Sequence, residues 1–123
     1  MSIASDLMRG NTDMIILAHL CQGDSYGYEI NKMISQKSGN RLELKEATLY
    51  GAFRRLEEAG HITFYWGDER TGARRRYYRI TPSGRGFFEE SKKDWEEARD
   101  IIDALVAPGG AGYQQENREE STL

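Results

Sequence analysis

The chain has 123 residues, enough for one domain with a hydrophobic core but too few for two domains of ordinary size. A net charge of −3 argues against a uniformly basic nucleic-acid binder, and the longest apolar run, MIILA, is too short to span a bilayer. The single cysteine, Cys21, excludes an internal disulfide, and the first ten residues do not resemble a secretory signal. We therefore expect a cytoplasmic protein with no membrane partner.

Positive charge is concentrated in the middle of the chain. Residues 41–79 contain nine basic and six acidic side chains, whereas residues 87–105 contain three basic and seven acidic ones. When a charged partner docks on one face of a protein, the local field matters more than the sum of charges. The basic middle segment is therefore the candidate binding surface.

A first helix is predicted after Asn11, Thr12 and Asp13, which are residues that cap helices well. Its apolar side chains recur at helical spacing, and those expected to face the core are Met14, Ile15, Leu17, Ala18 and Cys21.

A second helix is expected to begin near Ser25 or Tyr26 and to end at residues 38–40, which read SGN. Its inward-facing side chains are predicted to be Ile30, Met33 and Ile34. Residues 41–44 fit either a very short strand or an extended linker.

The third helix, within residues 45–60, has a clear apolar stripe of Leu49, Ala52, Phe53 and Leu56, and Gly60 ends it. Small and basic residues lie on the opposite face. Gly51 is informative there, because a glycine inside a helix costs about 0.5–1 kcal/mol relative to alanine. Close approach of this face to DNA would explain the glycine, and so would neutral drift. Tyr50 on the flank is expected to belong partly to the core.

A β-hairpin is predicted next, since residues 61–66 and 76–80 alternate as strands do and flank a TG turn. Five arginines lie in residues 70–79, with Asp68 and Glu69 just before them. They form either a phosphate-binding tip or a solvated face paired with those acids. Alternation places Arg74, Arg76 and Tyr78 on one side of the strand and Arg75, Tyr77 and Arg79 on the other.

Three helices followed by a two-stranded wing is the order of a winged helix-turn-helix, in which the third helix enters the major groove of DNA. Arginines on a wing beside that helix can neutralise phosphates and release counterions. The residues expected to contact double-stranded DNA are Lys45, Thr48, Tyr50, Gly51, Arg54, Arg74, Arg75 and Arg76.

A long last helix is predicted over residues 81–107, and its apolar side chains step by three and four residues. They are Phe88, Ser91, Trp95, Ala98, Ile102 and Leu105. A head this small cannot cover such a stripe, so a second chain is expected to cover it. The predicted organisation is a winged helix-turn-helix in 1–80, a dimerisation helix in 81–107 and a disordered tail in 108–123. The fold class is mainly α with a small β-hairpin.

These segments resemble the PadR family of winged-helix transcriptional repressors. The resemblance runs over about residues 5–105, through LMRGNTDMIILAHL, GDSYGYEI, LKEATLYGAFRRLEEAGHI, YWGDERTGARRRYYRIT and the tryptophan of the last helix. It implies a homodimer that binds an imperfect palindrome near its own or a neighbouring promoter. The short C-terminal region resembles the compact branch of the family that includes multidrug-sensing repressors.

That branch implies an effector slot in which a flat aromatic compound stacks at Trp95, although a tryptophan at this position can also simply fill the core. The residues expected to line the slot are Leu7, Met8, Gly10, Met14, Lys92, Glu96 and Arg99. Multidrug sensors carry an acid one turn beyond the tryptophan, where this chain has Arg99. Neutral or anionic aromatic compounds are therefore favoured over cationic drugs.

Catalytic and metal chemistry are not expected. His19 and Cys21 are two residues apart on a helix, so their side chains point about 200° apart and cannot share an ion. Cys21 fits an inert thiol, and the chain has no phosphate-binding loop or nucleophile elbow, so we expect no cofactor. The remaining alternative is a winged-helix adapter that binds proteins rather than DNA, which would have a hydrophobic wing.

Overall fold

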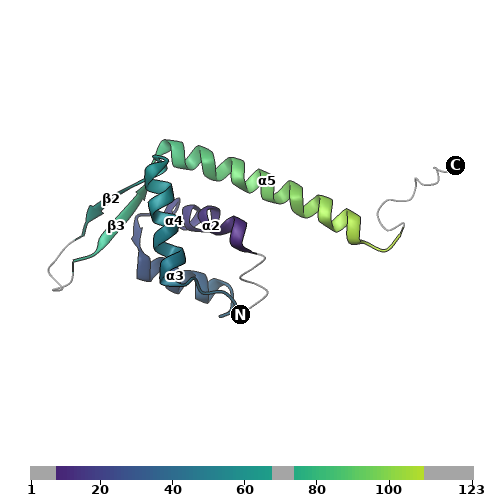
Figure 1. Cartoon of the computed structure of the whole chain (residues 1–123), viewed down its shortest axis with the longest axis horizontal. Coiled ribbons are helices and arrows are strands. Elements are labelled where there is room, and N and C mark those ends of the chain that lie inside the picture. Colours follow the sequence, from purple (N-terminus) through teal and green to yellow (C-terminus); the bar gives the residue numbers. More distant parts are fainter. Residues whose placement is uncertain (1–7, 68–73, 110–123) are drawn as a thin grey trace. The chain divides into compact units, whose positions relative to one another are not determined.

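The computed structural model describes residues 8–67 and 74–109. The chain separates into two compact units, Met1–Glu90 and Ser91–Leu123. The first unit contains a three-stranded sheet, the 3-10 helix η1 (Arg9–Asn11) and the helices α2 (Thr12–Leu20), α3 (Gly27–Lys37) and α4 (Glu46–Glu58). It also contains the start of α5 (Pro82–Val106), which is one continuous helix (Figure 1). The predicted tail lies largely outside the described residues.

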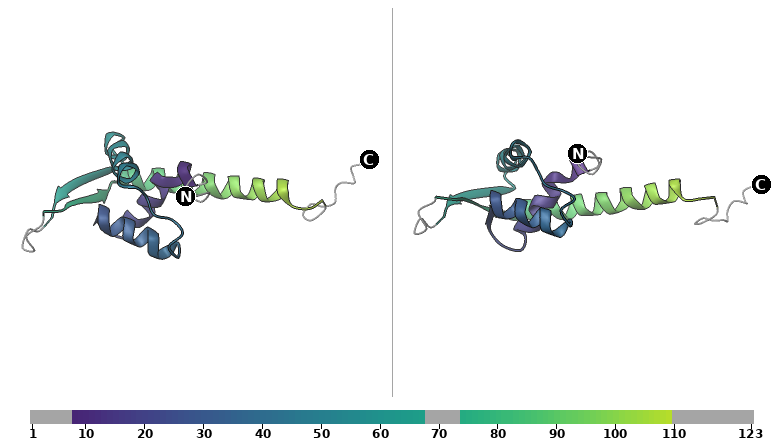
Figure 2. Two further views of the ribbon diagram at one scale, coloured as in Figure 1. Left: turned by 60° about the horizontal axis from the view of Figure 1, so that its bottom comes forward. Right: turned by 90° about the horizontal axis from the view of Figure 1, so that it is seen from below.

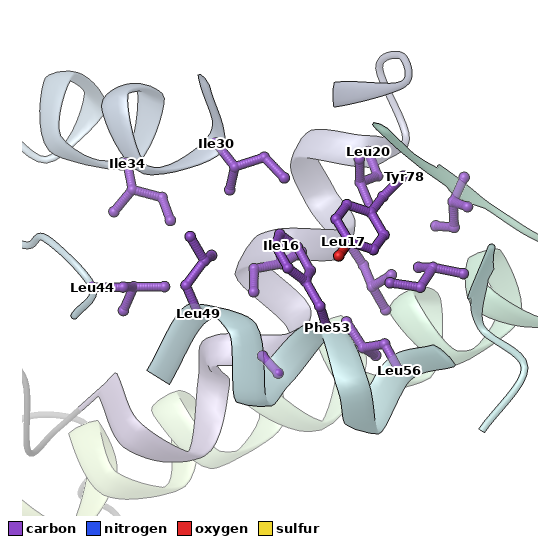
Figure 3. Close-up of a cluster of buried hydrophobic side chains, with 13 residues drawn as sticks. Ile16, Leu17, Leu20, Ile30, Ile34, Leu44, Leu49, Phe53, Leu56 and Tyr78 are labelled. Atoms are coloured by element: carbon purple, nitrogen blue, oxygen red, sulfur yellow. The ribbon is translucent and has the colours of Figure 1, made fainter. Parts of the chain in front are cut away.

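The core of the first unit lies between α2, α3, α4 and the sheet. Side chains from these helices converge on one centre, together with Leu44 from the loop before α4 and Tyr78 from the sheet (Figure 3). The ring of Tyr78 stacks on that of Phe53 at a centroid distance of 4.0 Å. Burial of each large apolar side chain stabilises the fold by about 1.5–3 kcal/mol, so this centre fixes how α4 packs against the sheet.

The inward face of α2 differs from the prediction. Ile16, Leu17 and Leu20 are buried, whereas most of the side chains expected there are only partly buried, namely Met14, Ile15, Ala18 and Cys21. The MIILA segment is apolar on every side, so spacing alone cannot identify the buried face. In α3 and α4 a polar face opposes the apolar one, and there Ile30, Ile34 and the stripe beginning at Leu49 are buried as predicted, whereas Met33 is only partly buried.

The sheet has three antiparallel strands in the order β1-β3-β2, with β1 at Ser25–Tyr26, β2 at Ile62–Trp66 and β3 at Arg76–Ile80. The hairpin of β2 and β3 was predicted, but β1 was not, because a two-residue strand carries no periodicity. Ser25 and Tyr26 pair with Tyr78 and Tyr77, so α3 begins at Gly27 rather than at the expected residues. Residues 41–44 form a linker, not a strand.

The first turn of α5 is attached tightly to the end of α4 and the start of β2. Thr81 Oγ1 accepts a hydrogen bond from the Gly84 amide at 3.0 Å and donates one to the Gly60 carbonyl at 2.7 Å. A Cβ on Gly84 would lie 2.1 Å from the His61 carbonyl oxygen, a distance that no side chain tolerates. Only glycine therefore allows this approach of helix and strand.

The second unit contains the rest of α5, which is helical to Val106, close to the predicted end. Several of its large apolar side chains are exposed, from 38 % for Trp95 to 78 % for Leu105, and the others are Ile101, Ile102 and Val106.

Candidate nucleic-acid interface

The outer face of α4 is lined by small side chains. Ala47 and Thr48 are exposed, and Gly51 lies between them and Arg55 along the helix. A Cβ on Gly51 would meet only Arg55 Nη1, at 4.0 Å, so packing within the described part of the chain does not require glycine there. The face therefore has space for a partner that approaches the backbone of α4 closely.

Tyr50 belongs to both the core and the surface. Its ring contacts Phe53 edge-on at 5.5 Å, and its hydroxyl oxygen would lie 2.6 Å from a Cβ placed on Gly27. The side chain is nevertheless 45 % exposed. Gly27 thus has a structural role at the start of α3, whereas its neighbour Tyr28 is 70 % exposed.

The two arginines of α4 differ in their contacts. Arg55 donates two hydrogen bonds to Asp13 of α2, from Nη2 at 2.6 Å and from Nε at 3.4 Å, and this bonding raises the pKa of Arg55. Arg54 is exposed and has no hydrogen bond or ion pair with any described residue. Arg54 is therefore free to bind a partner, while Arg55 connects α4 to α2.

An open groove runs along α4 between this helix, residues 8–13 and the loop 40–45. Three of the predicted DNA-contacting residues line it, namely Lys45, Thr48 and Gly51. Lys45 precedes the first turn of α4, and no side chain caps that turn. The backbone amide groups of the first turn and the ammonium group of Lys45 therefore lie at the same end of the groove.

The wing is defined here as residues 62–66 and 74–80, which are strands β2 and β3 together with Arg74 and Arg75 just before β3. One face of the wing carries Arg74 and Arg76 stacked on aromatic rings. The guanidinium of Arg74 lies 4.2 Å from the Trp66 ring centre, and that of Arg76 lies 3.7 Å from the Phe64 ring centre. Arg76 Nη2 also contacts both carboxylate oxygens of Glu57 on α4, at 3.2 and 3.3 Å. This ion pair connects the wing to α4, and in both views of Figure 2 the two strands extend outward from beside that helix.

The other face of the wing carries Arg75 and Arg79, so the predicted alternation is correct. Arg75 lies 4.8 Å from the ring centre of Tyr26, and Arg79 lies 4.9 Å from that of Tyr65. Asp24 accepts hydrogen bonds from the Tyr65 hydroxyl at 2.7 Å and from Arg79 Nε at 3.2 Å. Arg70, Asp68 and Glu69 lie outside the described residues.

Asp24 and Glu57 were not identified as contact residues from the sequence, since their arginine partners lie far along the chain. The structure brings the α4 and wing members of the predicted DNA-contacting set into one unit. The predicted effector residues divide between units: Lys92, Trp95, Glu96 and Arg99 lie on α5 in the second unit, and Met8, Gly10 and Met14 lie in the first. Met8 and Gly10 also line the groove beside α4, and Leu7 lies outside the described residues.

A chain of hydrogen bonds connects His19, Ser25 and Glu29, but it does not have the geometry of a catalytic triad. His19 Nε2 lies 3.2 Å from Ser25 Oγ, and Ser25 donates to Glu29, so the serine, not the histidine, is the central group. The hydroxyl is also buried. Within the described residues, no cluster of His, Cys, Asp and Glu side chains could hold a metal ion.

Comparisons with known proteins identify the family. The family model described as "Transcriptional regulator PadR-like family" matches residues 16–90. This chain belongs to that family. It is 46 % identical over 104 residues to an uncharacterised protein of Lysinibacillus sphaericus, covering 85 % of this chain and 95 % of that one.

Solved structures of PadR-type regulators have the same fold. A transcriptional regulator from Clostridium thermocellum is 47 % identical and superposes with a TM-score of 0.78, covering 84 % of this chain and all (100 %) of that one. A PadR family transcription regulator from Clostridium difficile is 33 % identical with a TM-score of 0.67, covering 77 % and 97 % of the two chains.

The predicted fold class is therefore confirmed as a PadR-type winged helix, and the protein is a DNA-binding transcriptional regulator. Since the family consists of transcriptional regulators, the prediction that the chain is not an enzyme is also confirmed. Among the described residues, no helix is both long enough and apolar enough to cross a membrane.

Proposed function

We propose that this PadR-type regulator is a cytoplasmic homodimeric repressor that binds a palindromic operator and leaves it when a small aromatic effector binds. The observation that carries the proposal is the pairing of a helix that has an open, small-residue face with an arginine-rich wing in one unit. Such a helix fits the major groove, while stacked arginines beside it suit the phosphate backbone.

The dimer follows from the apolar stripe of α5. Exposed large apolar patches mark interaction sites, and Trp95, Ile102 and Leu105 recur on the predicted seam. We expect the full-length chain to scatter light as a dimer at micromolar concentration and removal of residues 87–123 to give a monomeric or poorly soluble head. A monomeric full-length chain would contradict this part of the proposal.

The operator is the part of the proposal that footprinting tests most directly. Two heads related by a two-fold axis would place their α4 helices about one turn of DNA apart, roughly 34–36 Å, and so prefer a palindrome. Footprinting of the purified protein on its own upstream region should protect two half-sites at this spacing. Protection without a repeated half-site would count against the palindrome.

The effector is assigned to Trp95. The Arg99 guanidinium lies 4.9 Å from the Trp95 ring centre, so positive charge accompanies the indole and favours neutral or anionic aromatic compounds. A bound compound releases DNA only if it binds one arrangement of the heads more tightly than the other. Planar aromatics should quench tryptophan fluorescence in the wild type but not in Trp95→Ala, where Trp66 remains as the internal control. Equal binding to both proteins would exclude Trp95 as the site.

A further inference from the structure

The outer part of the wing lies beyond the hydrophobic core. Ile62, Tyr78 and Ile80 at the base of the two strands are buried, but Phe64 and Trp66 further along β2 are exposed. Apolar burial therefore fixes the base of the wing and leaves its outer part to be oriented by other contacts.

Two carboxylates contact the wing from opposite faces. Glu57 on α4 pairs with Arg76, whose guanidinium covers the Phe64 ring. On the other face, Asp24 in the loop before β1 accepts from Tyr65 of β2 and from Arg79 of β3. Because the strand order is β1-β3-β2, Asp24 reaches from beside β1 across β3 to the far strand.

On the face of the wing that contacts Asp24, a row of packed aromatic rings connects Tyr65 to the ring beneath Arg75. Tyr65 stacks on Tyr77 at 5.6 Å, Tyr77 packs on Tyr26 at 5.2 Å, and Arg75 lies over Tyr26. The hydrogen bond to Asp24 raises the pKa of Tyr65, in agreement with a phenol that donates to a carboxylate.

We propose that Asp24 and Glu57 are positioning residues for DNA binding, which hold the wing from its two faces at the angle that α4 requires. The proposal rests on the DNA-binding function stated above. Arg76 and Arg79 then serve mainly to orient the wing, because each of them is paired with one of these two acids.

The proposal predicts an effect opposite in sign to simple electrostatics. Removing an acid beside a DNA-binding surface strengthens attraction to phosphate, and here it would also release an arginine. If the acids position the wing, their removal instead weakens DNA binding. The wing is then loosely held in the free protein, and fixing its orientation on DNA costs conformational entropy.

The test uses the full-length protein and fluorescence anisotropy on two labelled duplexes, the footprinted operator and a scrambled duplex of the same length, over a range of salt. Asp24→Ala and Glu57→Ala should each weaken operator binding by about twofold to fivefold without reducing the salt slope. Glu58→Ala is the matched control, since Glu58 is an exposed acid next to Glu57. It should leave affinity unchanged or raise it slightly.

Tyr65→Phe separates positioning from charge, because it keeps the net charge and the ring stack but removes the donor to Asp24. It should also weaken operator binding, and it should add no further loss in the Asp24→Ala background. An NMR titration of labelled tyrosine should show the pKa of Tyr65 falling towards its ordinary value in Asp24→Ala.

Tighter binding by Asp24→Ala and Glu57→Ala, as for Glu58→Ala, would overturn the proposal, because the acids would then merely mask arginines. Unchanged binding by Tyr65→Phe with a normal melting temperature would overturn the role of Asp24 even if the alanine variants unfold. A wild-type protein without salt-dependent binding to either duplex would instead refute the DNA-binding function itself.

Discussion

The outer face of α4 and the wing lie in the same unit, but their chemistry is opposite. On α4 the outward side chains at Ala47, Thr48 and Gly51 are small, and a Cβ on Gly51 would meet only Arg55 Nη1, at 4.0 Å. On the wing, four arginines each lie over an aromatic ring, and two of them are also paired with acids. In the proposed complex with DNA, the small face would permit close approach to base edges, whereas the pre-ordered arginines would supply affinity that does not depend on sequence.

The largest effect is expected from removing the wing arginines. Arg74→Ala, Arg75→Ala and Arg76→Ala combined should weaken operator and scrambled duplexes alike, by about tenfold to a hundredfold at moderate salt, because phosphate contacts are lost. The slope of log affinity against log salt should flatten as well. Unchanged affinity and slope would show that the wing does not bind the backbone.

Substitutions on α4 should instead change sequence preference. Thr48→Ala should cost about 1–3 kcal/mol at one or two operator positions if Thr48 contacts a base, with little change on the scrambled duplex. Single base-pair variants of the operator measure this. A uniform loss of affinity across all operator variants would mean that α4, like the wing, contacts DNA without reading its sequence.

Gly51→Ala should separate stability from recognition. It should raise the free energy of unfolding by about 0.5–1 kcal/mol, since alanine favours the helix and meets no close neighbour. Operator binding should weaken, because the methyl group holds α4 away from DNA. Denaturant unfolding and anisotropy on the same protein give both quantities, and equal operator affinity would contradict the close approach.

A smaller effect is expected for the pair of Asp13 and Arg55. A double-mutant cycle with alanine should give a coupling of about 0.2–1 kcal/mol in the free energy of unfolding, because the Arg55 side chain is 59 % exposed to solvent, and high salt should reduce it. Arg55→Ala should alter DNA binding less than Arg54→Ala. A larger effect of Arg55→Ala than of Arg54→Ala would mean that Arg55 releases Asp13 when DNA binds.

The smallest effect is a pH dependence of stability from His19, which supports β1 through Ser25. Burial lowers the pKa of His19 from 6.5, and Lys37 lowers it further, against the opposing effect of Glu29. Because the folded-state pKa lies below the unfolded value, this stability is complete above about pH 6.5 and is lost as the pH falls towards the folded-state pKa. His19→Gln should show less loss of unfolding free energy than the wild type between about pH 7.5 and about pH 5.5.

The buried and exposed sides of an element could be predicted from the sequence where one of its faces is apolar and the other is polar. The stripe of α4 and the alternation of the wing arginines were predicted correctly, since burial and exposure follow a period that can be counted. On α2 the spacing identified Leu17 but missed Ile16 and Leu20, because the central segment of this helix is apolar all round. Strand β1 and the contacts of Asp24 and Glu57 could not be found, because they depend on residues brought together only by folding, such as Asp24 and Arg79.

The contact of Gly84 with the His61 carbonyl limits how this chain can evolve. Since a Cβ there would meet that oxygen at 2.1 Å, every substitution at residue 84 forces helix and strand apart. The exposed residues further along α5, such as Leu105, meet no such limit within the described chain. Descendants of this sequence are therefore expected to vary the distal part of α5, and with it the choice of partner, while they inherit the first turn of the helix unchanged.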